Sequence, residues 1–322
     1  PGPDGRDHLS DRGARLSVVP ERGGPRLRHR LLASCEFPPP GSAVDCAVSG
    51  GPDSLALLVL AVTAGCTVTA WHVDHGLRPG SATESEVVAS AATRYGARSR
   101  MVRAPVPPGP NLEDRARRAR FGVLPSGVLT GHTADDQAET ILLAILRGAG
   151  VDGLAGMGPG RHPLLALRRS DTEALCADEG LSPVRDASND ELVQVRNRVR
   201  HQLLPLAADI AGRDVVPLLT RTAALVRADA EVLAAAAADL DATDARALSA
   251  APAATARRAV RTWLIAQASS GAPAYPPSAA AVERVLAVAR GEAVACEVAG
   301  VGRVARHQQR LTVERGRRGE DG

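Results

Sequence analysis

The chain has 322 residues, of which 44% are hydrophobic and 23% charged, with a formal net charge of +3. This length suffices for a large domain with a buried core and a smaller second domain. No apolar run is long enough to cross a bilayer, and residues 1–30 are polar and arginine-rich, without the apolar core of a secretory signal. We therefore expect a cytoplasmic protein.

Two residue types exclude several kinds of site. The five cysteines are scattered and lack C-x-x-C spacing, so neither a disulfide framework nor a zinc or iron–sulfur site is indicated. The sequence contains no lysine, which excludes a Walker A phosphate site, Schiff-base chemistry and a lysyl–AMP intermediate on the enzyme. Aromatic residues make up only 2%, so any base stacking must depend mainly on arginine planes.

The first predicted strand and helix enclose a glycine turn. Residues 1–36 are expected to be a poorly ordered extension with one short basic helix over 26–32. A buried strand is predicted from residue 43, and an apolar helix over 54–64. Adjacent glycines before a helix N-terminus let the backbone bind a phosphate closely. Serine hydroxyls can donate further hydrogen bonds to it, and a proline fits the first turn of the helix. The expected phosphate-binding residues are Ser49, Gly50, Gly51, Pro52, Asp53 and Ser54.

The carboxylate in this turn predicts a metal ion. A carboxylate beside phosphates is repulsive unless a divalent cation bridges them, so we expect Asp53 to hold Mg²⁺ through the phosphates. The alternative is a strand–turn–helix corner that binds no ligand.

The second predicted strand, over 66–73, ends in a polar loop. In an α/β sheet, groups at the C-terminal ends of strands face the ligand crevice, which places His72, Asp74, His75 and Arg78 near a nucleotide. One alternative is a metal site made of His72, Asp74 and His75, but its ligands are few and close together. Another is polar loop residues with local hydrogen bonds.

A third strand is predicted over 99–104, followed by a helix over 111–121 that carries four arginines within six residues. They cover more than one helix face, so some must point towards a site. We assign Arg115 and Arg118 to solvent and retain Arg117 as a candidate.

A fourth strand, over 127–130, leads into a second polar cluster. His132 precedes a helix whose first turns carry Asp135, Asp136 and Glu139, and whose apolar positions repeat as on a buried face. A favourable interaction with the helix dipole accounts for one acidic residue near the helix N-terminus, but hardly for three. The number of acids therefore favours a functional role for the cluster.

The rest of the chain contains one more polar segment. After a glycine-rich stretch over 148–160 and a helix over 170–180, Arg196, Asn197, Arg198 and Arg200 suggest a surface facing a polyanion. Their spacing on a helix also permits a solvated stripe. We expect two or three helices over 207–268, another over 279–290, and short strands over 293–298, 302–306 and 310–314.

These elements predict a fold class and three segments. The fold class is α/β, a Rossmann-like parallel sheet with a mostly helical C-terminal domain that ends in a few short strands. The expected segments are an extension (1–36), a nucleotide-binding α/β domain (37–206) and a helical domain (207–322).

The six residues 49–54 of the glycine turn resemble the signature of the PP-loop ATP pyrophosphatases, which cleave ATP between the α- and β-phosphates. Over about residues 43–206 the order of the motifs is similar to that of the tRNA(Ile)-lysidine synthases. The matching segments are 49–54, 72–78, 116–117 with 120–121, 132–140, 146–148, 153–154, 163–165, 186–189 and 196–200. Departures from the family pattern are His162, Phe121, Ala187 and Asp45, together with a short C-terminal region.

The resemblance implies a tRNA-modifying ligase. It implies that the sheet is of the PP-loop type, that residues 37–206 form the ATP-binding catalytic domain and that residues 207–322 bind tRNA. ATP would adenylate the wobble cytidine of tRNA(Ile) with a CAU anticodon at the oxygen of ring position two. The ε-amine of L-lysine would then displace AMP to form lysidine. The implied partners are ATP, Mg²⁺, L-lysine and this tRNA. No membrane is involved, and a homodimer is one possible assembly.

The same resemblance suggests roles for the candidate residues. The catalytic set is Asp53, Arg117, His132, Asp136 and Glu139. Asp135, Asp136 and Glu139 would bind lysine. Arg78, Asn189, Arg196, Asn197, Arg198 and Arg200 would contact RNA. The alternatives are another PP-loop tRNA-modifying enzyme, such as a thiolase, an amide-forming synthetase of the same superfamily, and a non-catalytic module that binds ATP or RNA.

Overall fold

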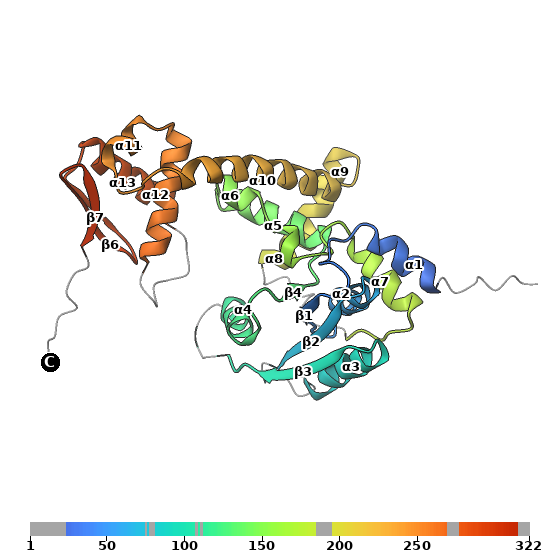
Figure 1. Cartoon of the computed structure of the whole chain (residues 1–322). Helices are drawn as coiled ribbons and strands as arrows, with labels where there is room; N and C mark the ends of the chain where they lie inside the picture. The colour runs from blue at the N-terminus through green and yellow to red at the C-terminus, as the bar shows by residue number, and fades with distance from the viewer. Residues whose placement is uncertain are drawn as a thin grey trace, which may run out of the picture. The chain divides into compact units, whose positions relative to one another are not determined.

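The computed structural model describes residues 24–74, 76, 81–106, 109, 112–184, 195–268 and 277–314. They form two compact units (Figure 1). The first unit contains residues 24–134 and 159–184, and the second contains residues 135–158 and 195–314. The segment boundaries expected from the sequence stay a prediction.

A parallel sheet organises the first unit. Its four strands are β1 (Ala43–Ala47), β2 (Thr67–Asp74), β3 (Arg98–Arg103) and β4 (Leu129–Thr130), in the order β3-β2-β1-β4. In the register of β1, Ala43 pairs with Thr67 on one side and Cys46 with Leu129 on the other. Because all four strands run the same way, their C-terminal ends meet at one edge of the sheet, as the sequence predicted.

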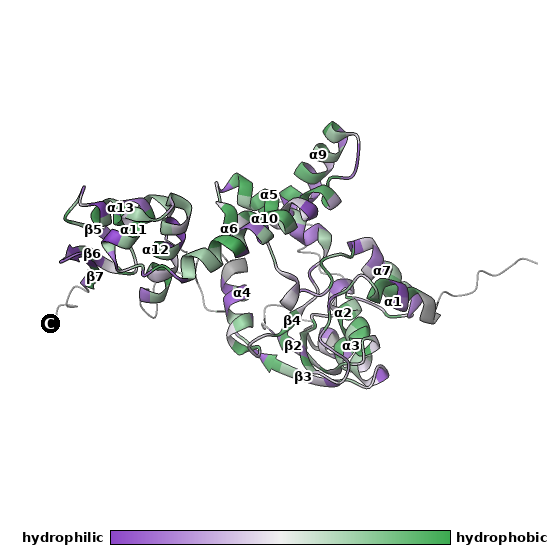
Figure 2. Ribbon diagram, turned by 45° about the horizontal axis from the view of Figure 1, so that its top comes forward, coloured by the Kyte–Doolittle hydropathy of each residue, from purple (hydrophilic) through white to green (hydrophobic). Residues whose placement is uncertain are grey.

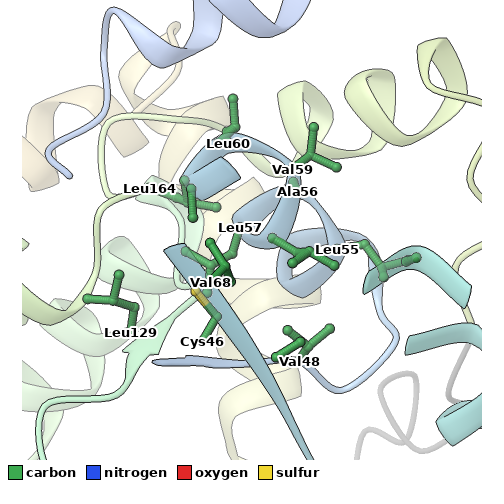
Figure 3. Packing of buried hydrophobic residues seen from close by; sticks show 14 of the residues in the cluster. Cys46, Val48, Leu55, Ala56, Leu57, Val59, Leu60, Val68, Leu129 and Leu164 are labelled. Atoms are coloured by element: carbon green, nitrogen blue, oxygen red, sulfur yellow. The ribbon is translucent and has the colours of Figure 1, made fainter. Parts of the chain in front are cut away.

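Helices connect these strands and cover the sheet. They are α1 (Gly24–Leu32), α2 (Pro52–Thr63), α3 (Ser81–Arg94), α4 (Leu112–Val123) and α7 (Arg169–Asp178), with a 3₁₀ turn, η1 (Pro159–Arg161). The nearly all-apolar sequence of α2 is explained by its position, since its side chains from Leu55 to Ala61 are fully buried (Figure 3). Each large aliphatic side chain buried in this way contributes about 1.5–3 kcal/mol.

The short basic helix expected near the N-terminus is present as α1. Its Leu31 belongs to the same buried cluster as α2, so this part of the expected extension packs on the core.

The second unit is mostly helical. Its helices are α5 (Ala134–Leu146), α6 (Val151–Leu154), α8 (Val195–Arg198), α9 (Leu204–Ala211), α10 (Val216–Ala238), α11 (Ala245–Ala250), α12 (Ala253–Gln267) and α13 (Ala279–Arg290), with a π-helical turn, η3 (Val199–Leu203). Apolar residues follow much of α5 and α13 (Figure 2). Among the described residues, no helix combines the length and the apolar character that a membrane crossing needs.

The sequence predicted two or three helices over residues 207–268. Three helices, α10, α11 and α12, begin in this range, and α9 begins just before it and ends within it. Gly212, at φ +61°, ends α9 in the left-handed conformation, and prolines stand at the starts of α9, α10 and α12. These residues divide the alanine-rich sequence at points that its composition alone did not reveal.

The second unit ends in an antiparallel sheet of β5 (Ala295–Val298), β6 (Gly302–His307) and β7 (Arg310–Glu314). The β6–β7 turn is formed by Gln308 and Gln309, both with positive φ, at 45° and 68°. This turn geometry is usually occupied by Asn-Gly, so the two glutamines carry backbone strain. With this sheet in place, the predicted fold class is confirmed.

Candidate active site

The turn between β1 and α2 has the backbone that a phosphate-binding loop requires. Gly50 has φ +91°, and its carbonyl accepts a hydrogen bond of 3.0 Å from the N–H of Val184. Gly51 has φ −74°, so of the two glycines only Gly50 is required by the turn itself. A Cβ on Gly51 would have Ser49 Oγ as its nearest contact, at 3.7 Å. The missing side chain at Gly51 therefore leaves room for a close approach to the backbone.

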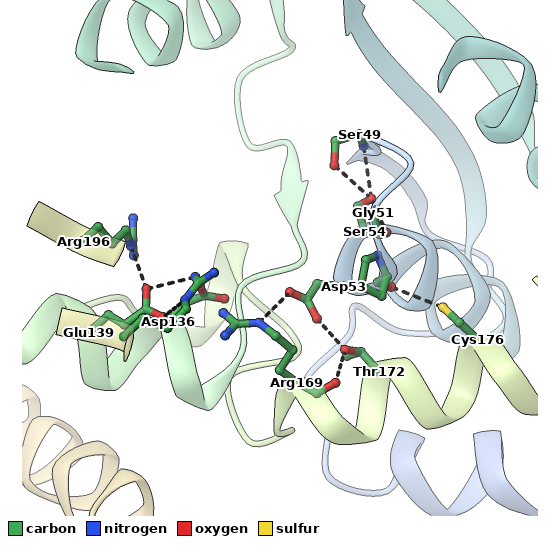
Figure 4. Close-up of polar contacts among 12 residues, drawn as sticks. Ser49, Gly51, Asp53, Ser54, Asp136, Glu139, Arg169, Thr172, Cys176 and Arg196 are labelled. Carbon is green, nitrogen blue, oxygen red and sulfur yellow. Dashed lines mark hydrogen bonds and ion pairs between the residues drawn. The ribbon is translucent and has the colours of Figure 1, made fainter. Parts of the chain in front are cut away.

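The two serines of the loop bind each other. Ser54 Oγ accepts a hydrogen bond from the N–H of Ser49 at 3.1 Å and donates one to the carbonyl of Gly51 at 2.9 Å. The two hydroxyl oxygens are 3.2 Å apart (Figure 4). Ser54 thus closes the turn just where α2 begins, and the first N–H groups of that helix are the donors that an anion would use.

Asp53, the expected magnesium residue, already lies beside a cation. Its Oδ1 accepts a hydrogen bond from Thr172 Oγ1, and its Oδ2 is 3.6 Å from Nε of Arg169 (Figure 4). Both partners lie on α7, more than a hundred positions further along the chain. The sequence analysis missed them because nothing in their spacing relates them to Asp53. The Asp53 side chain is 24% exposed and can therefore be reached from solvent.

His72 and Asp74, both on β2, differ in their burial and in their hydrogen-bond partners. His72 is 3% exposed, and its Nδ1 lies 3.1 Å from the carbonyl oxygen of Val48. Because a carbonyl only accepts, Nδ1 carries the proton, and in the neutral ring Nε2 is a buried acceptor; no hydrogen-bond partner for it is found among the described residues. Asp74 accepts a hydrogen bond from the N–H of Gly76 at 2.8 Å and lies 3.7 Å from Arg103. Asp74 therefore contacts both its own loop and the neighbouring strand β3.

His132 follows β4 and belongs to a cluster of three polar side chains. Thr130 Oγ1 lies 2.6 Å from Nδ1 of His132 and 2.6 Å from Nδ1 of His162. Between Thr130 and His132, a Cβ on Gly131 would lie 2.5 Å from the backbone oxygen of Asp53. Glycine is therefore required there, and the chain carrying His132 passes directly against the start of α2.

Arg117 lies on α4 and is exposed. Its guanidinium carbon is 5.5 Å from the centre of the Phe121 ring, and that of Arg161 is 5.7 Å from the same ring. Each contact is a cation–π arrangement of modest strength.

In the second unit, Glu139 is the most deeply buried acid of α5. It is 0% exposed, and Arg196 and Arg200 neutralise it. Nε of Arg196 lies 2.9 Å from Oε2, while Arg200 contributes Nε at 2.7 Å from Oε1 and Nη2 at 3.2 Å from Oε2 (Figure 4). Asp136, also buried, lies 3.6 Å from Arg200, and Asp135 is half-buried. The cluster is thus a nearly closed network of charge-assisted hydrogen bonds.

The arginine-rich segment presents two faces. Arg196 and Arg200 are four residues apart across the junction of α8 and η3, and their side chains are only 25% and 23% exposed. Arg198 lies between them in the sequence, is exposed and pairs with Gln202 at 3.4 Å. Asn197 is buried. The stripe is therefore not simply solvated, because two of its arginines bind an internal acid.

The structure does not test every candidate. His75, Arg78 and Asn189 lie outside the described residues. For the other candidates, the structure gives their positions and neighbours, and their assigned roles stay predictions.

Comparison with known proteins assigns the chain to a class and then to a family. Residues 27–207 match the family model of the PP-loop domain, and residues 244–312 match that of the TilS substrate binding domain. A tRNA(Ile)-lysidine synthase of Nocardia farcinica is 45% identical over 77% of this chain and 83% of its own length. Those of Rhodococcus erythropolis and Rhodococcus jostii are 41% and 39% identical, over 70% and 76% of this chain and 75% and 81% of their own lengths. The chain is a PP-loop protein, and it belongs to the tRNA(Ile)-lysidine synthase family.

Proposed function

We propose that this protein ligates L-lysine to the wobble cytidine of tRNA(Ile) with a CAU anticodon. In the first step the oxygen at ring position two attacks the α-phosphorus of ATP, the bond to the β-phosphate breaks and pyrophosphate leaves. In the second step the ε-amine of lysine attacks the ring carbon, the carbon–oxygen bond breaks and AMP leaves. The reaction is expected in the cytoplasm.

The observation that carries this proposal is the turn between β1 and α2 in a chain of this family. Gly50 in the left-handed region and the uncrowded Gly51 form a loop at the N-terminus of a 12-residue helix, which suits the phosphates of ATP. His72 supports the same assignment. Its buried Nε2 is an acceptor that needs a hydrogen-bond donor. The nucleoside part of ATP supplies such donors, in the ribose hydroxyls and the adenine amino group, whereas ionised phosphate oxygens do not.

The residues present fit a magnesium ion. Mg²⁺ usually binds through one or two carboxylates together with substrate phosphates, and Asp53 supplies one carboxylate beside the loop. Arg169 already pairs with that carboxylate at 3.6 Å, so the ion would share or replace this contact. When bound, the ion would neutralise charge on the leaving pyrophosphate.

Lysine brings two ammonium groups and a carboxylate to the site. We propose that Asp135 and Asp136 hold its amine, and that His132 or Asp135 assists the deprotonation. The prediction that Glu139 also binds the amine is retained. In this structure its carboxylate is occupied by two arginines, which supports a role in orienting them as well.

The tRNA would be held by arginines and amides. We propose Arg196, Asn197, Arg198 and Arg200 as contacts to the anticodon loop, whose bases must be splayed out to be read. Arg78 and Asn189 complete this proposed set. The exposed Arg117 would stabilise the activated phosphate or the cytidine. A homodimer stays a prediction that sedimentation velocity would test.

The cysteines argue against the thiolase alternative. Sulfur transfer needs a reactive thiolate. Burial raises the pKa of Cys35, Cys46 and Cys176 to about 12, with nearby acids adding to the effect for the last two, and burial also raises the pKa of Cys66 and Cys296.

The test is incorporation of labelled L-lysine into an unmodified tRNA(Ile) transcript bearing CAU, with ATP and Mg²⁺. Asp53→Ala should abolish the label, whereas Glu231→Ala, which removes an exposed acid of α10, should leave it unchanged. Pyrophosphate release without label would indicate a different nucleophile. Neither signal from a folded protein would favour a binding module.

A further inference from the structure

Two arginines of the first unit share one aromatic ring. Phe121 is half-buried on α4, and its ring centre lies 5.5 Å from the guanidinium carbon of Arg117 and 5.7 Å from that of Arg161. Arg117 lies one turn earlier on the same helix, whereas Arg161 comes from the separate turn η1. The ring therefore holds two positive charges near the same point.

Neither of these arginines has an acidic partner. Among the residues that the structure describes, Arg117 forms no hydrogen bond or ion pair, and Arg161 uses only its Nε, which donates to the carbonyl of Val128 at 3.4 Å. Both side chains are exposed. A guanidinium carries five N–H donors, so most donors of the pair remain available to a ligand.

The sequence near the ring contains no acid that could neutralise the two charges. Residues 115–134 include four arginines and residues 159–170 include three, and neither segment contains Asp or Glu. Like charges held near one ring repel each other, so the arrangement gains most from an anion that contacts both. Stacking on a ring also keeps the planar donor groups in place before a ligand arrives. The pair therefore suits a phosphate.

We propose that Arg117 and Arg161, both held by Phe121, bind one strand of the tRNA, with Arg161 on a backbone phosphate next to the nucleotide that Arg117 meets. This inference rests on the proposed function, in which Arg117 reaches the wobble cytidine or its activated phosphate. The phosphates of ATP are assigned to the turn between β1 and α2, so the RNA backbone is the other source of phosphate. Phe121 is a positioning residue, since it contacts the arginines.

A purely structural role of Arg161 makes different predictions. If its side chain only fastened η1 to the carbonyl of Val128, its loss would lower stability and leave the salt dependence of tRNA binding unchanged. If it neutralises a phosphate, its loss removes the release of one counterion. The logarithm of the binding constant then falls less steeply with the logarithm of the salt concentration.

The test measures how tightly the full chain binds an unmodified tRNA(Ile) transcript bearing CAU as the salt concentration is varied. We expect Arg161→Gln to reduce the slope of the double-logarithmic plot by about 0.7, the contribution of one phosphate on a single strand, and to weaken binding about fivefold at about 0.1 M salt. ATP affinity, measured by calorimetry, should be unchanged. An unchanged slope, or a loss of ATP affinity in place of tRNA affinity, would overturn the proposal.

Arg94 provides a matched control in the same unit. It is an exposed arginine of α3 whose guanidinium carbon lies 5.5 Å from the ring centre of Tyr95. Arg94→Gln therefore removes one charge and one cation–π contact, as Arg161→Gln does, and should leave the slope unchanged. Equal reductions for the two variants would indicate a general effect of surface charge and would contradict a specific site.

Two substitutions of Phe121 test its positioning role. Phe121→Tyr keeps the ring and should bind the tRNA as the wild type does. Phe121→Leu keeps both charges but no longer holds the guanidiniums, so the slope should stay while the affinity falls by less than for Arg161→Gln. Full tRNA affinity of Phe121→Leu would contradict this role. If the wild type binds no tRNA at all, the proposed function itself fails; if the wild type modifies the tRNA and Arg161→Gln leaves the slope unchanged, only this inference fails.

Discussion

Replacing Glu139 by Gln tests how strongly the second unit depends on one buried carboxylate. Glu139→Gln keeps the shape of the side chain and removes its charge. The carboxylate is 0% exposed and accepts hydrogen bonds of 2.7, 2.9 and 3.2 Å from two guanidiniums. The amide nitrogen of Gln would instead present hydrogen atoms to one guanidinium, so at least one contact becomes repulsive.

The magnitude follows from these contacts. A hydrogen bond to a charged group contributes about 1.5–3 kcal/mol, and removing one partner of a buried ion pair costs about 3–5 kcal/mol. The arginine side chains are 25% and 23% exposed, so water can solvate them in part after the change. The amide oxygen also still accepts. We therefore expect the free energy of unfolding to fall by about 2–4 kcal/mol.

The assay can be confined to the second unit. The chain has two tryptophans, Trp71 in β2 and Trp263 in α12. In a Trp71→Phe background, fluorescence during urea unfolding reports on Trp263 alone. Glu231→Gln, at an exposed position of α10, should change the free energy of unfolding by less than about 0.5 kcal/mol. A change as small as this for Glu139→Gln would refute the reasoning.

Four further substitutions have defined outcomes. Gly50→Ala, at φ +91°, should lower both stability and ATP affinity, whereas Gly51→Ala, at φ −74°, should weaken ATP binding in calorimetry without changing the melting temperature by more than about 2 °C. Gln309→Gly should raise the free energy of unfolding by about 1 kcal/mol in the same urea assay, because glycine relieves the strain at φ 68°. Burial raises the pKa of Cys46 to about 12, above its unfolded value of about 8.5, so its contribution to stability is complete below pH 8.5 and is lost as pH rises towards 12. Cys46→Ala should make the free energy of unfolding depend less steeply on pH over that range. An unchanged pH dependence would contradict this.

Local pattern was enough for most elements of the fold. The apolar run after Ser54 predicted a helix buried on nearly all sides, and the spacing of apolar residues after Glu139 predicted α5. Glycine and proline positions marked most ends of elements, because these residues restrict or release the backbone without help from distant parts of the chain. Within residues 207–268 the composition was too uniform for this, so the sequence predicted two or three helices there without their bounds.

The sequence by itself determined the chemical types in the site: a phosphate loop with one carboxylate, acids at the start of α5, and arginines near residue 200. Only the tertiary structure decided which groups meet. Thr172 and Arg169 reach Asp53, two arginines neutralise Glu139, and His162 shares Thr130 with His132. Periodicity describes neighbours within a helix or strand, whereas these contacts join residues 32 to 119 positions apart, apart from Thr130 and His132. Such pairs are selected by the packing of whole elements, which no local pattern encodes.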